Sequence, residues 1–260
     1  MFGEALRPFK TVNGQGASDI VIVCDHASCL VPADLDDLGL DGALLRGHIG
    51  WDIGAADVAR GLAERLDAPA VLAGFSRLVI DPNRAPGHPH SIRAESDGVS
   101  VPGNRDIGRA EAARRARQWY RPYHQEIESQ LRRVQARAAP LLISVHSFTP
   151  VMNGVARPWH AALLHGDDAR PVAPLMAAFH ARYPDLVVGD NEPYTGYPDQ
   201  SHTVPHHAER RGLANITFEV RQDLIESPRG VERWVEILCD VLATARAAPG
   251  NWISLSSRAT

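Results

Sequence analysis

The chain has 260 residues, more than one typical domain of roughly 150 residues and fewer than two. Hydrophobic residues make up 44% and charged residues 22% of it, and its net charge is -4. These values are ordinary for a globular chain and exclude the disordered, collagen and coiled-coil classes. No apolar run approaches the ~18 residues of a membrane-spanning helix, and residues 1–4 do not have the basic-then-apolar shape of a secretion signal. We therefore expect a cytoplasmic protein with no membrane partner.

The cysteine and basic residues exclude two further classes. Three cysteines, at positions 24, 29 and 239, are too few and too irregular for a disulfide framework. The 27 basic residues are outnumbered by 31 acidic ones, and Lys10 is the only lysine, so there is no overall positive field to attract nucleic acid. The densest basic stretch, 105–137, interleaves Arg with Glu and Ala at helical spacing, which is typical of a solvated helix face.

Short apolar segments alternate with longer amphipathic ones along the chain. The short segments predict strands at 19–24, 70–73, 141–145, 161–164, 186–188 and 215–220. The longer segments predict helices at 53–66, 107–136, 171–183, 202–211 and 231–247. This alternation indicates an α/β fold with a mixed, mostly parallel sheet between helices. With no internal repeat or composition step, residues 1–260 are expected to form a single domain.

Two stretches, 81–106 and 189–205, are rich in Pro, Gly, His and Asp. Loops of this length inside a compact domain commonly carry function. The second of them is a candidate for closing over a bound substrate.

Polar residues follow several of the apolar segments directly. Asp25 and His26 come after 19–24, and His146 comes after 141–145. Glu219 lies at the end of 215–220, and 81–84 follows the apolar run 78–80. Ligands in open α/β sheets bind at the carboxyl ends of the strands, so these segments predict one shared site.

Two histidines and a carboxylate from different strands form the ligand set of a catalytic zinc ion that keeps one position open for water. No HExxH motif is present, and Cys29 and Trp51 stand three residues after His26 and His48, where an H-x-x-E motif would have glutamate. Spacing alone therefore leaves His26 and His146 as either metal ligands or ordinary hydrogen-bonded histidines.

For Glu219 and for three arginines, the sequence allows either a role in the reaction or an ordinary ion pair. A carboxyl group at a dry sheet edge has a raised pKa that suits a general base, but Glu219 could instead pair with Arg221, two residues further on the same strand face. Arginines 77, 84 and 221 could bind a substrate carboxylate, or pair with Asp81 or Asp223.

The sequence resembles the N-formylglutamate amidohydrolase family through a series of ordered motifs. They are CDHAS-x-x-VP (24–32), HIGWDIGA (48–55), FSRLVIDPNR (75–84), SVHSFTP (144–150), GDNEPYTG (189–196) and HAERRGLANITFEVRQDLI (207–225). The match is to a divergent branch of the family. It implies a fold like that of the zinc carboxypeptidases and aspartoacylase-type deacylases, of the phosphorylase/hydrolase-like kind, with one zinc ion per chain.

The resemblance also implies roles for individual residues. His26 and His146 match the histidine ligands, and Glu219 matches the catalytic glutamate. Asn83 and Arg84, in a D-x-N-R element, match groups that hold the substrate carboxylate and carbonyl. Because the usual ligand position holds Cys29, we expect Asp52 to be the carboxylate ligand, with Asp25 or His48 as alternatives.

The expected reaction is hydrolysis of the N-formyl or N-acyl amide bond of a small carboxylate-bearing amino acid, such as N-formylglutamate, or of a short peptide. Zinc would activate water, Glu219 would transfer its proton to the leaving amine, and Arg84 would help to stabilise the oxyanion. Arg77 and Arg221 are further candidate contacts for the substrate.

Two other functions stay open at this point. One is a metal-free cysteine hydrolase that uses Cys24 or Cys29 with His26. The other is a protein that binds a small carboxylate without catalysis, which the departure from H-x-x-E allows.

Overall fold

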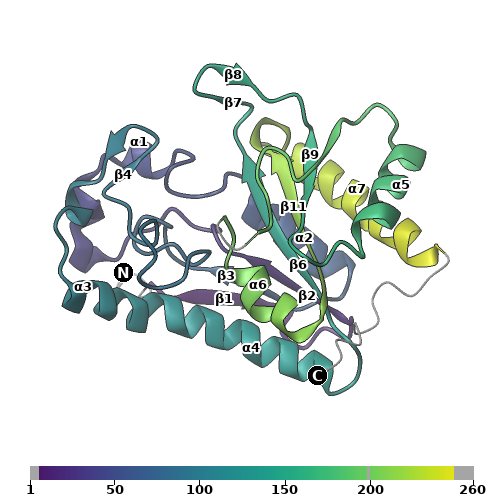
Figure 1. The fold of residues 1–260 in the computed structure, drawn as a ribbon, viewed down its shortest axis with the longest axis horizontal. Coiled ribbons are helices and arrows are strands. Elements are labelled where there is room, and N and C mark those ends of the chain that lie inside the picture. Colours follow the sequence, from purple (N-terminus) through teal and green to yellow (C-terminus); the bar gives the residue numbers. More distant parts are fainter. Residues whose placement is uncertain (1–5, 198–199, 249–260) are drawn as a thin grey trace.

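The computed structural model describes residues 6–197 and 200–248. Within them a seven-stranded sheet has the order β1-β3-β2-β6-β11-β9-β10 (Figure 1). The strands are β1 (Phe9–Val12), β2 (Ile20–Cys24), β3 (Ala70–Ala73), β6 (Leu141–Phe148), β9 (Ala161–Leu164), β10 (Val188–Asp190) and β11 (Ala214–Arg221). Only the pairs β1–β3 and β9–β11 are antiparallel, so the predicted mixed, mostly parallel sheet is confirmed.

Helices cover both faces of the sheet because its central strands are apolar on both sides. In β2, Ile20, Ile22 and Cys24 belong to one buried cluster, and Val21 and Val23 belong to the other. Successive side chains of a strand point to opposite faces, so a continuous apolar run requires cover on both. The first cluster packs against α2 (Ala55–Arg65), α5 (Val172–Arg182) and α7 (Pro228–Ala247). The second packs against α4 (Arg121–Gln135), the long helix along the lower edge of Figure 1.

The predicted helix 107–136 forms, but its winding changes in the middle. Helix α3 (Arg109–Arg115) leads through a π turn (Ala116–Tyr120) into α4. Pro122 has no N–H, and in a regular helix its ring would clash with the carbonyl of Gln118. The wider π turn lies directly before Pro122, and proline and π turns are both common where the winding of a helix changes.

The two long loops contain short elements that hold their shape. The first includes the hairpin β4 (Glu95–Ser96) and β5 (Val99–Ser100), whose two turn residues, Asp97 and Gly98, both have positive φ. An Asp-Gly pair is the usual sequence for this tight turn. The second loop leads into α6 (Thr203–His207).

The structure differs from the predicted elements in several places. Helix 202–211 is reduced to α6 and a 3-10 turn (Glu209–Arg211) that ends at Gly212, whose φ of 66° is left-handed. The apolar run 78–80 is a buried turn rather than a strand. Elements without a prediction are β1, helix α1 (Gly42–Leu45), the 3-10 turns Ala33–Gly39, Pro102–Asn104 and Gln222–Leu224, the hairpin of β4 and β5, and the hairpin β7 (Val151–Met152) and β8 (Val155–Ala156).

Among the helices in the described part of the chain, none has the length and apolar character needed to cross a membrane.

Candidate metal and catalytic site

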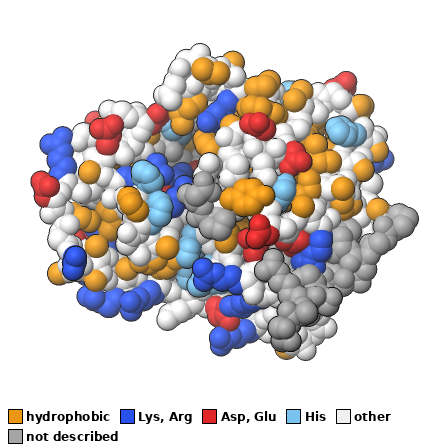
Figure 2. Space-filling model, viewed as in Figure 1, with side chains coloured by type: hydrophobic (Ala, Val, Ile, Leu, Met, Phe, Trp, Pro, Cys, Tyr) orange, Lys and Arg blue, Asp and Glu red, His pale blue; other side chains and the backbone are white. Residues whose placement is uncertain are grey.

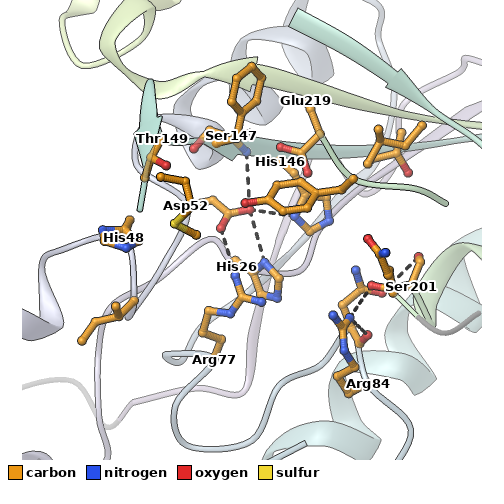
Figure 3. A pocket seen from close by; sticks show the side chains of 18 of the residues that line it. His26, His48, Asp52, Arg77, Arg84, His146, Ser147, Thr149, Ser201 and Glu219 are labelled. Carbon is orange, nitrogen blue, oxygen red and sulfur yellow. Dashed lines mark hydrogen bonds and ion pairs between the residues drawn. The ribbon is translucent and has the colours of Figure 1, made fainter. Parts of the chain in front are cut away.

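The site lies where β2, β6 and β11 end. Strand β2 ends at Cys24 and is followed by Asp25 and His26, while His146 lies within β6. Glu219 of β11 is the register partner of His146, so the two residues are adjacent across parallel strands. Asp52, from the loop before α2, completes the group, and Figure 3 shows its side chain between the two histidines.

His26, Asp52 and His146 each offer one ligand atom, and these atoms all lie within 4.8 Å of one another. Asp52 Oδ2 is 3.2 Å from His26 Nδ1 and 2.7 Å from His146 Nδ1. The three residues are buried, with at most 6% of the surface of any of them exposed. Two imidazole nitrogens and one carboxylate oxygen are the donor set of a catalytic zinc site with an open fourth position.

The outward nitrogens of both histidines face carboxylates. His26 Nε2 lies 2.8 Å from Asp81 Oδ1, and His146 Nε2 lies 3.3 Å from Asp25 Oδ2. A metal-binding histidine commonly donates its second N–H to a carboxylate, which fixes the ring orientation and makes the ligating nitrogen more basic. The residues present therefore fit a metal ion at the two Nδ1 atoms and Asp52.

Asp25 is itself held by two hydroxyl groups. Tyr123 Oη donates to Asp25 Oδ1 at 2.9 Å, and Thr203 Oγ1 donates to the same oxygen at 2.7 Å. Asp25 thus lies behind His146, on the side of its Nε2 atom. His48 lies near the cavity surface, where its Nε2 atom is 2.7 Å from Asp97 Oδ2. The structure brings Asp52, and neither of the two alternatives, into the cluster of possible metal ligands.

The pKa values of the two acidic groups at this site, Asp52 and Glu219, shift in opposite directions. Burial alone would raise the pKa of Asp52, but His26 and His146 bring it below its ordinary value. Burial, together with the negative charge of Asp52, raises the pKa of Glu219 to about 7. A carboxyl group with this pKa can both accept and donate a proton near neutral pH.

Glu219 does not form the ion pair with Arg221 that the sequence allowed. Its Oε2 atom is buried and has no hydrogen-bond partner among the described residues. Arg221 turns instead to Asp223, with Nε 2.8 Å from Oδ1. Arg221 is also absent from the cavity lining in the described part of the chain, so the structure does not place it beside the other predicted substrate contacts.

The cluster opens into a cavity of about 250 Å³. Arginine and histidine side chains gather around a recess near the middle of the face in Figure 2. The predicted residues that line the cavity are His26, Asp52, Arg77, Asn83, Arg84, His146 and Glu219. A cavity of this size accepts one small molecule.

The predicted substrate contacts have different partners within the protein. Arg77 pairs with Asp81, with Nη2 3.0 Å from Oδ2, and also lies 3.4 Å from Asp52. Asn83 Oδ1 accepts hydrogen bonds from the backbone N–H groups of His202 and Thr203 at 2.7 and 3.0 Å. Arg84 Nη1 donates to the backbone carbonyls of Asn83 and Gln200.

Sequence reasoning gave no role to several residues of the cavity wall, among them Tyr194 and Arg93. Tyr194 lies beneath the Arg157 guanidinium, 4.9 Å from its carbon to the ring centre, and Arg93 reaches the cavity from the first long loop. Tyr194 lies within the motif at 189–196, but the motif alone assigns it no role. No motif or strand end marked Arg93.

Comparisons with known proteins agree with the fold and the motifs. A family model described as N-formylglutamate amidohydrolase matches residues 18–226. A gene product of Agrobacterium tumefaciens of known crystal structure is 33% identical, with a TM-score of 0.88 over 92% of this chain and 94% of that one. An N-formylglutamate amidohydrolase from Ralstonia eutropha JMP134 is 20% identical, with a TM-score of 0.64 over 92% of this chain and 97% of that one, and shows the same fold. No curated protein matches the sequence. With the family model covering most of its length, the chain belongs to the N-formylglutamate amidohydrolase family.

Proposed function

We propose that this protein is a zinc-dependent amidohydrolase that cleaves the N-formyl or N-acyl amide bond of a small carboxylate-bearing substrate such as N-formylglutamate. His26, Asp52 and His146 would hold one zinc ion per chain. The observation that carries the proposal is Glu219, whose buried and unpartnered Oε2, among the described residues, lies beside the His-Asp-His cluster. A carboxyl group in this position suits proton transfer during hydrolysis.

A zinc ion held by His26, Asp52 and His146 would lower the pKa of a water molecule toward neutrality and polarise the substrate carbonyl. Glu219 acts as the general base that takes a proton from the attacking water. It then returns that proton to the nitrogen as the C–N bond breaks. The net reaction adds one water across the amide and releases a carboxylic acid and an amine.

The arginines and Asn83 orient the substrate. Arg84, in a loop held through Asn83 and Gln200, is placed to bind the carboxylate next to the scissile amide and to stabilise the charge on the amide oxygen. The Asn83 oxygen is used by α6, so its amide nitrogen is the atom that can meet the substrate carbonyl. Arg77 is balanced by Asp52 and Asp81 and maintains the shape of the cavity wall.

The test is an assay of the purified protein with N-formyl-L-glutamate, N-acetyl-L-glutamate and N-formyl-L-methionine, before and after treatment with a chelator. The expected result is release of one amine and one acid per amide cleaved, loss of activity with the chelator, and recovery when zinc is added. A zinc-loaded protein that hydrolyses none of the three would contradict the proposal.

A cysteine mechanism predicts a different outcome. Burial, with the charges of Asp52 and Asp25, raises the pKa of Cys24 well above its usual value, which leaves a protonated and unreactive thiol. The variants Cys24→Ala and Cys29→Ala should therefore retain most of the wild-type activity. Loss of activity in either, with folding intact, would favour the cysteine mechanism.

A further inference from the structure

Arg93 is a cavity residue whose charge has no partner among the described residues. No hydrogen bond or ion pair joins its guanidinium to another residue in the described ranges, and its Nε atom is buried without an acceptor there. The neighbouring Arg77 is paired with Asp52 and Asp81, and at the cavity surface His48 is paired with Asp97. Arg93 therefore contributes a positive charge that has no hydrogen-bonded or ion-paired carboxylate among the described residues.

The backbone around Arg93 is firmly held, although it lies in the long loop 81–106. Asn104 Nδ2 donates to the carbonyl oxygens of both Arg93 and Leu78, each at 2.8 Å. On either side, the Ser91 carbonyl accepts from Asp81 N at 2.7 Å, and the Ala94 carbonyl accepts from Val101 N at 2.9 Å. Three separate backbone contacts thus fix the position from which the side chain extends.

Asn104 is in turn fixed by a buried arginine. Arg115 is only 2% exposed, and its Nη1 donates to Asn104 Oδ1 at 2.6 Å. The same guanidinium donates to the carbonyls of Val79 and Gly103, each at 3.1 Å, and pairs with Glu111. This network uses buried polar groups to hold a loop, which indicates that the position of the loop matters.

A fixed and unpaired guanidinium in a small cavity is costly unless an anion binds to it. Burial and the nearby charge of Arg77 lower the pKa of Arg93, and the attraction of Asp81 does not offset them. The planar fork of arginine matches a carboxylate in a bidentate arrangement. A substrate carboxylate is therefore a good chemical complement to Arg93.

We infer that Arg93 binds a second carboxylate of the substrate and so makes the protein selective for N-acyl derivatives of acidic amino acids. This inference rests on the proposed function, in which Arg84 holds the carboxylate next to the scissile amide. Arg93 is a specificity-determining residue that acts on the far end of the substrate and takes no part in proton transfer.

The test compares N-formyl-L-glutamate with N-formyl-L-glutamine, which has nearly the same shape but lacks the second carboxylate. The variants are Arg93→Gln, Arg93→Lys and, as matched control, Arg105→Gln, which removes an exposed arginine of the same loop outside the cavity lining. Circular dichroism and metal content establish that each variant is folded and loaded.

Wild type and the Arg105→Gln control should prefer N-formylglutamate in kcat/KM. In Arg93→Gln this preference should fall by about 10- to 100-fold, the value of a charge-assisted hydrogen bond, mainly through a higher KM for N-formylglutamate. Arg93→Lys should keep part of the preference, because it retains the charge and loses the fork. An unchanged preference in Arg93→Gln, or an equal loss for both substrates, would overturn the inference.

Calorimetric binding of the same two compounds separates this inference from the proposed function. If wild type hydrolyses neither these two compounds nor the N-acyl amino acids of the first assay, the proposed function fails. Tighter binding of N-formylglutamate that disappears in Arg93→Gln would still support the role of Arg93. Equal binding of both compounds, or no binding of either, would overturn that role as well.

Discussion

Glu219 of β11 and His146 of β6 are register partners on adjacent parallel strands. The sheet therefore fixes the distance between the proposed general base and a proposed metal ligand, without relying on any loop. Catalysis by proton transfer requires this kind of fixed geometry, since small displacements of a catalytic group are costly.

Replacing Glu219 by Gln should abolish turnover while leaving the fold and metal binding intact. Glutamine keeps the shape of the side chain but cannot accept the proton, so kcat should fall by about 10² to 10⁴-fold. Steady-state kinetics and elemental analysis of the same sample measure both effects. Glu64→Gln, which changes an exposed carboxylate on α2, is the control and should have wild-type activity. A fully active Glu219→Gln would remove Glu219 from the mechanism.

Asp25 should matter for metal affinity although it is not expected to contact the metal. Asp25→Asn removes the negative charge that faces His146 Nε2 and should weaken metal binding by about 10- to 100-fold. Competition with a chelator at fixed pH measures this change, with Asp57→Asn on the surface of α2 as the control. Equal affinities of Asp25→Asn and wild type would show that the carboxylate behind His146 does not support a ligand.

Asn104→Ala should destabilise the protein and loosen the loop that carries Arg93. It leaves the buried carbonyls of Leu78 and Arg93 and one Arg115 donor without their hydrogen bonds, at a cost of about 2–4 kcal/mol. Thermal unfolding and limited trypsin cleavage within 81–106 report the two effects. Gln135→Ala, at an exposed position on α4, should change neither. Wild-type stability in Asn104→Ala would mean that the network does not hold the loop.

The stability of the metal-free protein should fall as the pH drops below 6.5. His124 and His207 are buried and share a short contact, with Nδ1 of His124 2.8 Å from Nε2 of His207. Burial lowers the pKa of His124 to about 4 and that of His207 to about 2, from the ordinary value of 6.5. Between pH 6.5 and 4 the unfolded chain therefore binds protons that the native state does not. This difference removes on the order of a few kcal/mol of stability by pH 4.

Urea unfolding across this pH range, with chelator present, measures the slope. His207→Phe removes one titrating group and should flatten the slope, whereas His180→Gln, at an exposed position on α5, should not change it. The other charged groups near the pair are His202, His206, Glu128, Arg211 and Asp25. A slope that is the same in His207→Phe and wild type would show that these histidines are not kept neutral by burial.

The central strands were predictable because burial on both faces requires continuous apolar runs. The edge strand β1 was not predictable, because Lys10 and Thr11 interrupt its apolar pattern. It forms through antiparallel pairing with β3, a long-range contact that has no local sequence pattern. The helix predicted at 202–211 is shorter in the structure. A 3-10 turn that ends at Gly212 takes the place of its last residues before β11 begins. The run at 78–80 has strand composition, yet it forms a turn.

The candidate site was predictable where a residue follows a strand. His26 follows β2, His146 and Glu219 lie near the carboxyl ends of β6 and β11, and the sheet brings the three together. Arg93 was not predictable, because its place depends on Asn104 and Arg115, and such long-range contacts leave no local pattern. Arg221 lies two residues from both Glu219 and Asp223, and only the folded backbone determines that it pairs with Asp223.

The most direct test of the proposed metal site is the metal content of the purified protein by elemental analysis, for wild type and His146→Ala, with N-formylglutamate hydrolysis measured on the same samples. The expected result is about one zinc per chain in the active wild type, and loss of both metal and activity in a folded His146→Ala. A folded wild type that hydrolyses N-formylglutamate without bound metal, or a His146→Ala variant that keeps its zinc and its activity, would contradict the proposed site.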